Sequence, residues 1–256
     1  MDGFPFPTID QITGTPDYEI IADIHLKLNS NAASVQSNLG CVTLGLLFLT
    51  VSPAVYATLS TTEFVPPVNP GPKPSIPTGS TGAVTANLRY LHTESTKIFT
   101  EYENTDKAIR QLLLASTDKL YVQSLCHKYI GYRKTTTQAL LDHLYYKYAK
   151  IYASALQDND KRLRAPYDSN QPLETLIDQV KNAVDYASAG DTPYTPSQVV
   201  GINFQLVFQT GIFNNECKLW RRQPVDVKTW TQFNEFFATS HQEWRESQTT
   251  TAGAVL

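Results

Sequence analysis

Two histidine–glutamate pairs are the first residues in this sequence whose spacing could support catalysis. His92-Thr93-Glu94 and His241-Gln242-Glu243 share the His-x-Glu spacing of zinc deaminases, in which the glutamate transfers protons. Such a site also needs a Pro-Cys-x-x-Cys element, and neither pair is followed by one. Both pairs are therefore predicted to be chance matches on helix surfaces, with no catalytic or metal-binding role.

The cysteines offer no better nucleophile or metal site. Cys126 and His127 are adjacent, so on a helix their side chains point about 100° apart, whereas a catalytic pair must converge. A buried structural cysteine beside a surface histidine is the expected arrangement. Cys41, Cys126 and Cys217 are far apart and odd in number, which argues against a disulfide framework and suits a reducing compartment. Glycine-rich nucleotide-binding and nucleophile motifs are missing, so no cofactor is expected.

A histidine and three tyrosines in "KTTTQALLDHLYYKY", residues 134–148, could form a reactive surface. Helical spacing divides them, because one face is apolar and consists of Leu140, Leu141, Leu144, Tyr145 and Tyr148. His143 is predicted on the solvent side with no metal or carboxylate partner. The tyrosines are predicted to be core or interface rings, so this helix, capped within residues 135–137, is assigned no chemistry.

Positive charge is concentrated in one part of a chain whose net charge is −3. Residues 119–150 contain six lysines and arginines against one acid, Asp142, which makes a candidate RNA-facing surface; a solvated face is the alternative. The candidate RNA-facing residues are Lys128, Arg133, Lys134, Lys147, Lys150, Lys161, Arg162 and Arg164.

Length and composition predict a soluble globular protein. The 256 residues, 41% of them hydrophobic, are enough for one large or two ordinary domains. The N-terminal residues lack the basic and apolar blocks of a signal peptide, and the longest apolar run, residues 42–51, is about half the length of a membrane span. An intracellular chain without a membrane partner is expected.

Helix signals dominate both halves of the sequence. Asp17 and Ser52-Pro53 predict two helix starts, whereas residues 42–51 could be a buried helical turn or a buried strand. A long apolar stripe follows residue 81, with a break expected near Asn104-Thr105-Asp106, and Thr117 or Asp118 caps a further helix. Thr195-Pro196 begins another helix in the second half.

Two segments interrupt this helical pattern. Residues 63–82 hold six prolines and three glycines, which predicts an extended surface excursion because proline fixes φ and removes a backbone donor. Residues 151–171 are rich in Asp, Asn, Lys and Arg and are the best place for a junction between two domains, although a weakly apolar helix that Pro166 stops is also expected within them. The sequence thus predicts an all-α protein.

The order of several blocks resembles the Gag polypeptide of copia-type LTR retrotransposons, in the algal and diatom branch. The blocks include "TTTQALLDHLYYKYAKI", "LQDNDKRLRAPYDSNQPLETLIDQVKNAVDYASAG", "PYTPSQVVGINFQLVFQTGIFNNECKLWRR" and "KTWTQFNEFFATSHQEWRESQ". The resemblance extends upstream through "LNSNAASVQSNLG", "TVSPAVYATLS" and "FVPPVNPGPKPSIPTGSTGA", and so covers about residues 18 to 248.

That resemblance implies a self-assembling capsid protein without enzymatic activity, forming a cytoplasmic virus-like particle around the element's RNA. Two small helical domains are expected, at residues 15–150 with a Pro-rich excursion at 63–82, and at residues 172–248. A disordered segment 1–14, a linker 151–171 and a disordered tail 249–256 complete the expected division. "NQPLETLIDQV" occupies the place of the capsid homology region but lacks its arginine, so no residue roles are carried over.

Two questions about function stay open at this level. The chain ends before any zinc knuckle of the Gag type, which suggests a truncated, processed or repurposed Gag; a domesticated host scaffold or adaptor is the alternative function. The candidate assembly residues are Trp220, Arg221, Arg222 and Tyr146, because Trp, Tyr and Arg are enriched in binding hot spots. For Trp230 a core position is favoured over an interface.

Overall fold

A computed structural model describes residues 3–253, with side chains described for residues 3–247. This part of the chain contains ten α-helices and no β-strand, so the predicted all-α fold is confirmed. The helices fall into two units, Met1–Lys150 (unit 1) and Ile151–Leu256 (unit 2). Each unit has a hydrophobic core of its own.

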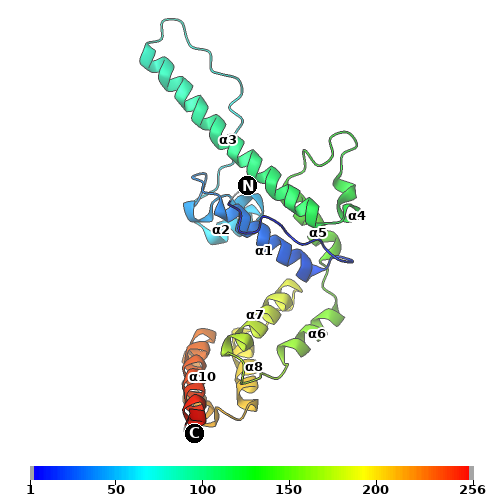
Figure 1. Ribbon diagram of the computed structural model, residues 1–256, viewed down its shortest axis with the longest axis vertical. Coiled ribbons are helices and arrows are strands. Elements are labelled where there is room, and N and C mark those ends of the chain that lie inside the picture. Colours follow the sequence, from blue (N-terminus) through cyan, green and yellow to red (C-terminus); the bar gives the residue numbers. More distant parts are fainter. Residues whose placement is uncertain (1–2, 254–256) are drawn as a thin grey trace. The chain divides into compact units, whose positions relative to one another are not determined.

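Unit 1 is built around three helices that share one core. In Figure 1 α1 (Tyr18–Ser34) lies against α3 (Gly82–Ser116) and α5 (Thr137–Tyr148), and α2 (Pro53–Leu59) and α4 (Lys119–Val122) flank them. The interior is mainly aliphatic: α1 contributes Ile21 and Leu28, α3 contributes Ile109, and α5 contributes Leu140 and Leu144. The predicted caps hold: Asp17 accepts from the backbone N–H of Ile20, Ser52 from that of Val55 and Thr136 from that of Ala139.

The apolar run at residues 42–51 is neither an α-helix nor a strand. It forms two 3-10 turns, Val42–Leu44 and Leu47–Leu49, which bury Leu46, Leu47 and Leu49 against α1. Gly45 joins the two turns with φ at +50°, and its Cα faces the carbonyl oxygens of Ala33 and Val35. A side chain at that position would collide with the end of α1, so glycine permits this close packing.

The predicted disorder of residues 1–14 is corrected for residues 3–14, which pack onto unit 1. Asn31 is fully buried and exchanges two 2.8 Å hydrogen bonds with the backbone of Phe6. Ile12 is buried, and its N–H donates to the carbonyl of Ser116 at 2.7 Å. The segment has no periodicity of its own, so these partners on α1 and α3 order it.

The expected break in the long helix is also wrong, because α3 runs unbroken for 35 residues. Thr105 donates its hydroxyl back to the carbonyl of Glu101 at 2.8 Å, and the Asp106 carboxylate binds Arg110 one turn later. Thr and Asp side chains often favour helix ends, but here both make hydrogen bonds within the helix or to α5, and the helix continues through them. All buried residues of α3 lie at or after Thr105, and its first half extends away from the rest of unit 1 (Figure 1).

Residues 60–81, between α2 and α3, contain no helix or strand. Phe64 anchors the start of this stretch, since its buried ring stacks on Phe48 with centroids 4.6 Å apart. Further along, the carbonyl of Gly71 lies 3.1 Å from His92 Nε2 on the first half of α3. The Pro-rich segment therefore runs beside that half-helix (Figure 1).

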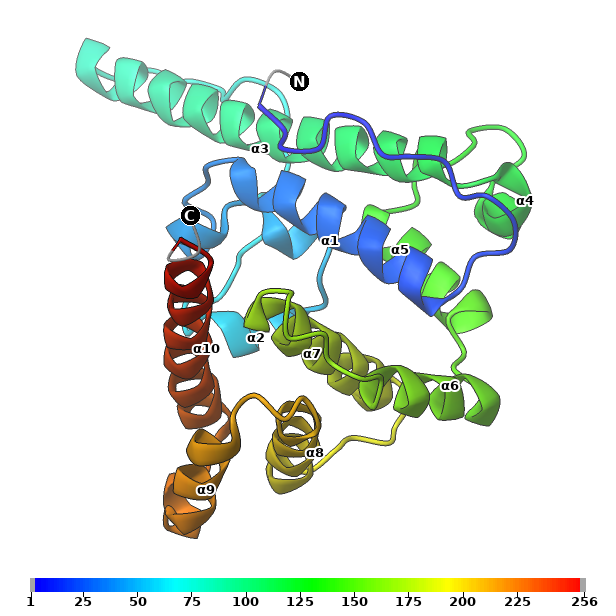
Figure 2. The same ribbon diagram turned by 60° about the horizontal axis from the view of Figure 1, so that its bottom comes forward.

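Unit 2 contains α6 (Ala153–Leu163), α7 (Leu173–Ala189), α8 (Pro196–Gln209), α9 (Asn214–Arg222) and α10 (Trp230–Gly253). Figure 2 shows α6 lying along α7. The core of unit 2 is more aromatic than that of unit 1 and includes Phe213, Trp220, Phe233 and Phe237. Thr195 and Gln198 form a reciprocal capping box at the start of α8.

Two predicted boundaries in unit 2 are corrected. The linker expected at residues 151–171 is largely α6, which confirms the helix predicted before Pro166. This helix is fixed to α7, because the buried Asn159 donates to the Ala183 carbonyl at 2.8 Å and Leu163 is fully buried. The tail expected to be disordered is helical through residue 253, as the end of α10; residues 254–256 lie outside the described residues.

A half-buried histidine in unit 1 predicts a dependence of stability on pH. His25 Nε2 lies 3.0 Å from the Thr50 carbonyl and Nδ1 lies 3.1 Å from the Tyr145 hydroxyl, a pattern that the neutral ring satisfies as donor and acceptor. Burial lowers the pKa of His25 below its ordinary value, against the opposing effect of the Thr50 bond. Burial has the opposite effect on the acidic Tyr145 hydroxyl, whose pKa it raises to about 12.

Unit 1 is therefore expected to lose stability as pH falls below about 6.5, the ordinary histidine pKa. Below that pH the unfolded chain takes up a proton that folded His25 does not bind, and the loss continues until the lower folded pKa is reached. Chemical denaturation at pH 5 to 8 measures it, with His25→Gln as the comparison. Equal pH slopes for the two proteins would show that His25 does not contribute.

Candidate functional site

Four of the candidate RNA-facing residues in unit 1 form two groups at opposite ends of α5. Arg133 and Lys134 lie in the turn before the helix, while Lys147 and Lys150 lie at its end, and all four are exposed. Twelve helical residues separate the groups by about 18 Å. Lys128 belongs to the loop closed by the His127–Gly131 bridge, where its ammonium lies 5.4 Å from the centre of the exposed Tyr129 ring.

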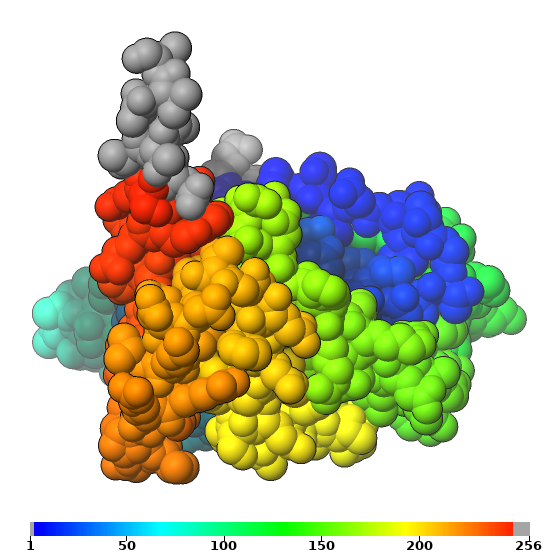
Figure 3. All heavy atoms as spheres, turned by 90° about the horizontal axis from the view of Figure 1, so that it is seen from below, coloured from blue at the N-terminus to red at the C-terminus, as the bar shows by residue number. Residues whose placement is uncertain are grey.

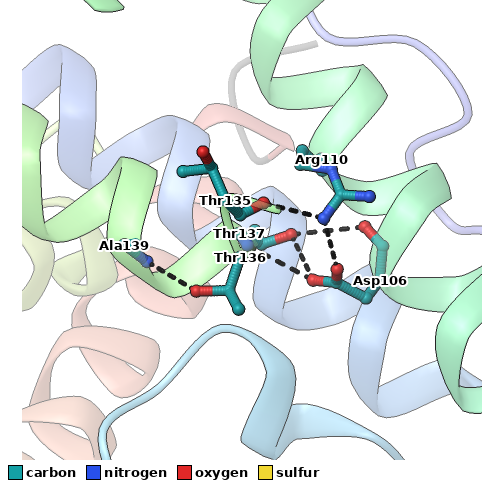
Figure 4. Close-up of polar contacts among 6 residues, drawn as sticks. All are labelled: Asp106, Arg110, Thr135, Thr136, Thr137 and Ala139. Carbon is teal, nitrogen blue, oxygen red and sulfur yellow. Dashed lines mark hydrogen bonds and ion pairs between the residues drawn. The ribbon is translucent and has the colours of Figure 1, made fainter. Parts of the chain in front are cut away.

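A buried ion pair fixes the first of these groups. Arg110 Nη1 lies 2.7 Å from Asp106 Oδ2 and 2.8 Å from the Thr135 carbonyl, with both side chains of the pair only 13% exposed (Figure 4). The other carboxylate oxygen of Asp106 accepts from the Thr137 hydroxyl at 2.8 Å and from the Thr137 N–H at 3.3 Å. The start of α5, and the basic turn before it, are thus held on α3.

In unit 2 the predicted basic residues are exposed but already partnered. Lys161 pairs with Asp158 at 2.7 Å and Arg164 with Asp160 at 2.9 Å, while the Arg162 guanidinium lies 5.3 Å from the centre of the Tyr186 ring. The hydrogen bond from Arg164 lowers the pKa of Asp160, which keeps that carboxylate charged. Acids therefore offset Lys161 and Arg164. Among the candidate RNA-facing residues, all of them described by the structure, Lys128, Arg133, Lys134 and Lys147 of unit 1 are in no ion pair.

An apolar groove of about 480 Å³ lies on unit 2 between α8, α9 and the start of α10 (hereafter the α8–α9 groove). Figure 3 shows the surfaces of α8, in yellow, and of the following segment, in orange, beside each other. Phe204, Trp220 and Trp230 supply aromatic walls, and Gly201 leaves open space along α8. Val225 is 86% exposed at the rim, so the groove opens onto an apolar surface.

The predicted assembly residues occupy different positions around this groove. Trp220 is predicted on an interface, but it is only 3% exposed, and its ring lies between 5.4 and 5.9 Å from the rings of Phe233, Phe236 and Phe237. Its place on the inward side of α9 explains this, because Cys217, one turn earlier, is buried as well. Trp230 is half-buried and packs against the core, as favoured.

Arg221 and Arg222 are exposed, and Arg221 is the one that borders the groove. Its guanidinium lies 4.6 Å from the centre of the Phe208 ring and 5.2 Å from that of Phe204. Tyr146 is 86% exposed on α5 and belongs to unit 1, so it is not part of this groove.

Sequence reasoning missed the contribution of α8 to this surface. A buried run between Pro196 and Gly211 is the expectation from the sequence, whereas Phe208 is 43% exposed and Phe204 half-buried. The sequence did contain a signal for this surface. The run is apolar on all sides of the helix, whereas a helix that buries one face needs apolar residues on that face alone. A glycine at residue 201, inside that run, was a second sign of close approach or open space.

The residues first considered for catalysis have ordinary structural partners. His92 Nε2 lies against the Gly71 carbonyl. His241 is buried, so its predicted position on a helix surface is wrong, and its Nε2 lies 3.1 Å from the Ser169 carbonyl and 3.3 Å from the Tyr167 hydroxyl. His143 is half-buried rather than solvent-facing, since its Nε2 lies 3.1 Å from the Tyr121 carbonyl. Cys126 is exposed, contrary to expectation, because the chain leaves the helix before it.

Within the described residues, no three His, Cys, Asp or Glu side chains cluster in a way that could hold a metal ion. In the same part of the chain, no helix is both long and apolar enough to span a bilayer. Comparison of the chain with models of protein families, with curated proteins and with solved structures finds no match.

Proposed function

We propose that this chain is a structural protein that assembles with copies of itself into a capsid-like shell around RNA in the cytoplasm, without enzymatic activity. The observation that supports this most is the α8–α9 groove, because contiguous exposed apolar surface with aromatic walls is typical of protein interaction sites. The resemblance of the ordered sequence blocks to copia-type Gag favours a second copy as the partner. Two helical units with separate cores suit a shell built from repeated modest contacts.

Self-assembly is tested by light scattering and electron microscopy of the purified full chain over a range of protein and salt concentrations. Particles or higher oligomers that form with rising concentration are the expected result. A strictly monomeric protein at high concentration in every condition would contradict the proposal. The alternative, a domesticated Gag that serves as a host scaffold or adaptor, predicts that no intact protease, integrase and reverse-transcriptase reading frames neighbour the gene.

RNA binding is proposed for unit 1, at the basic turn before α5. Replacing Arg133 and Lys134 with glutamate is expected to lower RNA retention and to reduce the salt slope of binding by roughly 0.7 to 0.9 for each phosphate that the chain no longer neutralises. Both side chains are exposed, so the fold should be unaffected. Filter binding at several salt concentrations measures the effect.

The matched control replaces Lys161 and Arg164 with glutamate, which makes the same change of charge at residues already paired with Asp158 and Asp160. A smaller effect on RNA binding is expected from this control. If both double variants lowered RNA binding equally, the proposal that unit 1 carries the RNA site would be wrong.

A further inference from the structure

The first part of the Pro-rich segment is an exposed apolar strip with no secondary structure. Residues 65–70, "VPPVNP", follow the anchored Phe64, and Val65 is 62% and Val68 84% exposed. At Gly71, where φ is +71°, the chain turns, and its N–H donates to the Asn69 side chain at 2.9 Å. The Val65 N–H donates to the Leu39 carbonyl at 2.8 Å, which anchors the start of the strip, while Pro67 and Pro70 are half-buried. The later residues Lys73, Pro74 and Ile76 lie near α3, where they line a cavity with Arg89 and His92, so the exposed strip is residues 65–70.

Proline chemistry prepares this strip for binding. Three prolines in six residues fix φ and favour a polyproline II conformation, which has three residues per turn. Val65 and Val68 then share one edge, about 9 Å apart at 3.1 Å per residue. Because the strip loses little backbone entropy on docking, it can bind with few contacts.

The α8–α9 groove has the features that recognise such a strip. Proline-rich segments dock on grooves lined by aromatic rings, and here Phe204, Trp220 and Trp230 line one of suitable volume. The basic residues at its rim, Arg221 and Lys228, complement Glu63, which is exposed two residues before the strip. The Arg221 guanidinium already stacks on Phe204 and Phe208, and Val225 makes the rim apolar, so the groove favours an apolar peptide over a nucleobase.

We infer that the α8–α9 groove of unit 2 binds the proline strip, residues 65–70, of a second copy of this chain. This inference rests on the proposed self-assembly and names one of its contacts. Each copy carries one groove and one strip, in different units, so the contact is head-to-tail and leads to rings or extended arrays. The strip of one chain and the groove of the next then link many chains through one repeated interaction.

The groove can be blocked without harming the fold. Gly201 lies in α8, is exposed, and a side chain added there meets no atom within 4 Å. Gly201→Gln places a long side chain in the groove while improving helix propensity, and Gly201→Ala improves propensity but leaves the groove open. The pair of variants separates blocking from folding.

Peptide binding tests the contact apart from assembly. The probe is the synthetic peptide VPPVNPGP, titrated against the full-length Val68→Lys chain, whose own strip is disabled, with tryptophan fluorescence as readout. Saturable binding of the peptide is expected. Adding Gly201→Ala to the Val68→Lys chain should leave the affinity unchanged, whereas adding Gly201→Gln should lower it by about tenfold or more, which corresponds to about 1.4 kcal/mol. The inference would be overturned if the peptide showed no saturable binding, or if both Gly201 variants bound it equally. It would also be overturned if the groove bound a single-stranded RNA instead of the peptide, with saturable RNA binding that Gly201→Gln abolishes.

Mixing two variants tests whether the contact joins separate copies. The Val68→Lys chain keeps its groove and the Gly201→Gln chain keeps its strip, so sedimentation should show a complex in the mixture that neither chain forms alone. Val55→Lys, a change at another exposed valine of unit 1, should behave as the unmodified chain. If both single variants assembled like the unmodified chain, the inference would fail while the proposed self-assembly would stand.

Discussion

Replacing Asp106 with alanine is expected to destabilise unit 1 by about 3–5 kcal/mol, because it leaves the Arg110 guanidinium buried without its counter-charge. The change also removes the acceptor for the Thr137 hydroxyl and N–H at the first turn of α5. Chemical denaturation followed by circular dichroism should show the transition of unit 1 at lower denaturant, with that of unit 2 unchanged.

The chain provides a matched control for this substitution in α1. Asp23 and Lys27 form an ion pair at the same i, i+4 separation, but the Asp23 side chain is 57% exposed. Asp23→Ala should cost less than about 1 kcal/mol, as is usual for surface pairs. Equal losses for Asp23→Ala and Asp106→Ala would show that the buried network does not stabilise the contact between α3 and α5.

Trp220→Ala is expected to cost unit 2 about 3–5 kcal/mol, the range for removing a large aromatic side chain from a core. Trp220 contacts three phenylalanine rings from α10, so its loss leaves a cavity between α9 and α10. Denaturation of the variant should show early unfolding of unit 2 alone.

Val225→Ala at the rim of the same groove is the control, and it should change stability by less than about 0.5 kcal/mol because the side chain is 86% exposed. A Trp220→Ala protein with unchanged stability and only weakened assembly would instead restore the predicted role of Trp220 as an interface residue.

Helix starts were the most predictable part of the fold. Asp17, Ser52 and Thr195 each cap a helix through a hydrogen bond to a backbone N–H three residues on. Such signals are local, since residue and partner lie within one turn. The predicted apolar face of α5 follows from equally local spacing, and Leu140, Leu141 and Leu144 are buried.

Errors arose where the deciding partner is distant in sequence. The order of residues 3–14 depends on Asn31 and Ser116, and the continuity of α3 through Asp106 goes with hydrogen bonds to Thr137, 31 residues away. Trp220 is buried by phenylalanines of α10 that only the tertiary fold brings to it. No pattern within a short window records such interactions.

For the candidate RNA-facing residues, exposure was predictable and grouping was not. The predicted basic residues are all exposed, but the ion pairs of Lys161 and Arg164 and the separation of the unit 1 cations by the length of α5 required the structure. The α8–α9 groove combines residues from three helices, and the sequence drew attention to residues of α9 and α10 but not of α8.

The unbroken α3 fixes the distance between its first turn and the core of unit 1. Its second half is embedded in the core, and its 35 residues make a rod of about 50 Å. A continuous helix resists bending far more than a loop, so anything bound at its first turn is held at a set separation and direction from that core. In an array of such chains, a contact made at the first turn of α3 would set the spacing between neighbouring chains.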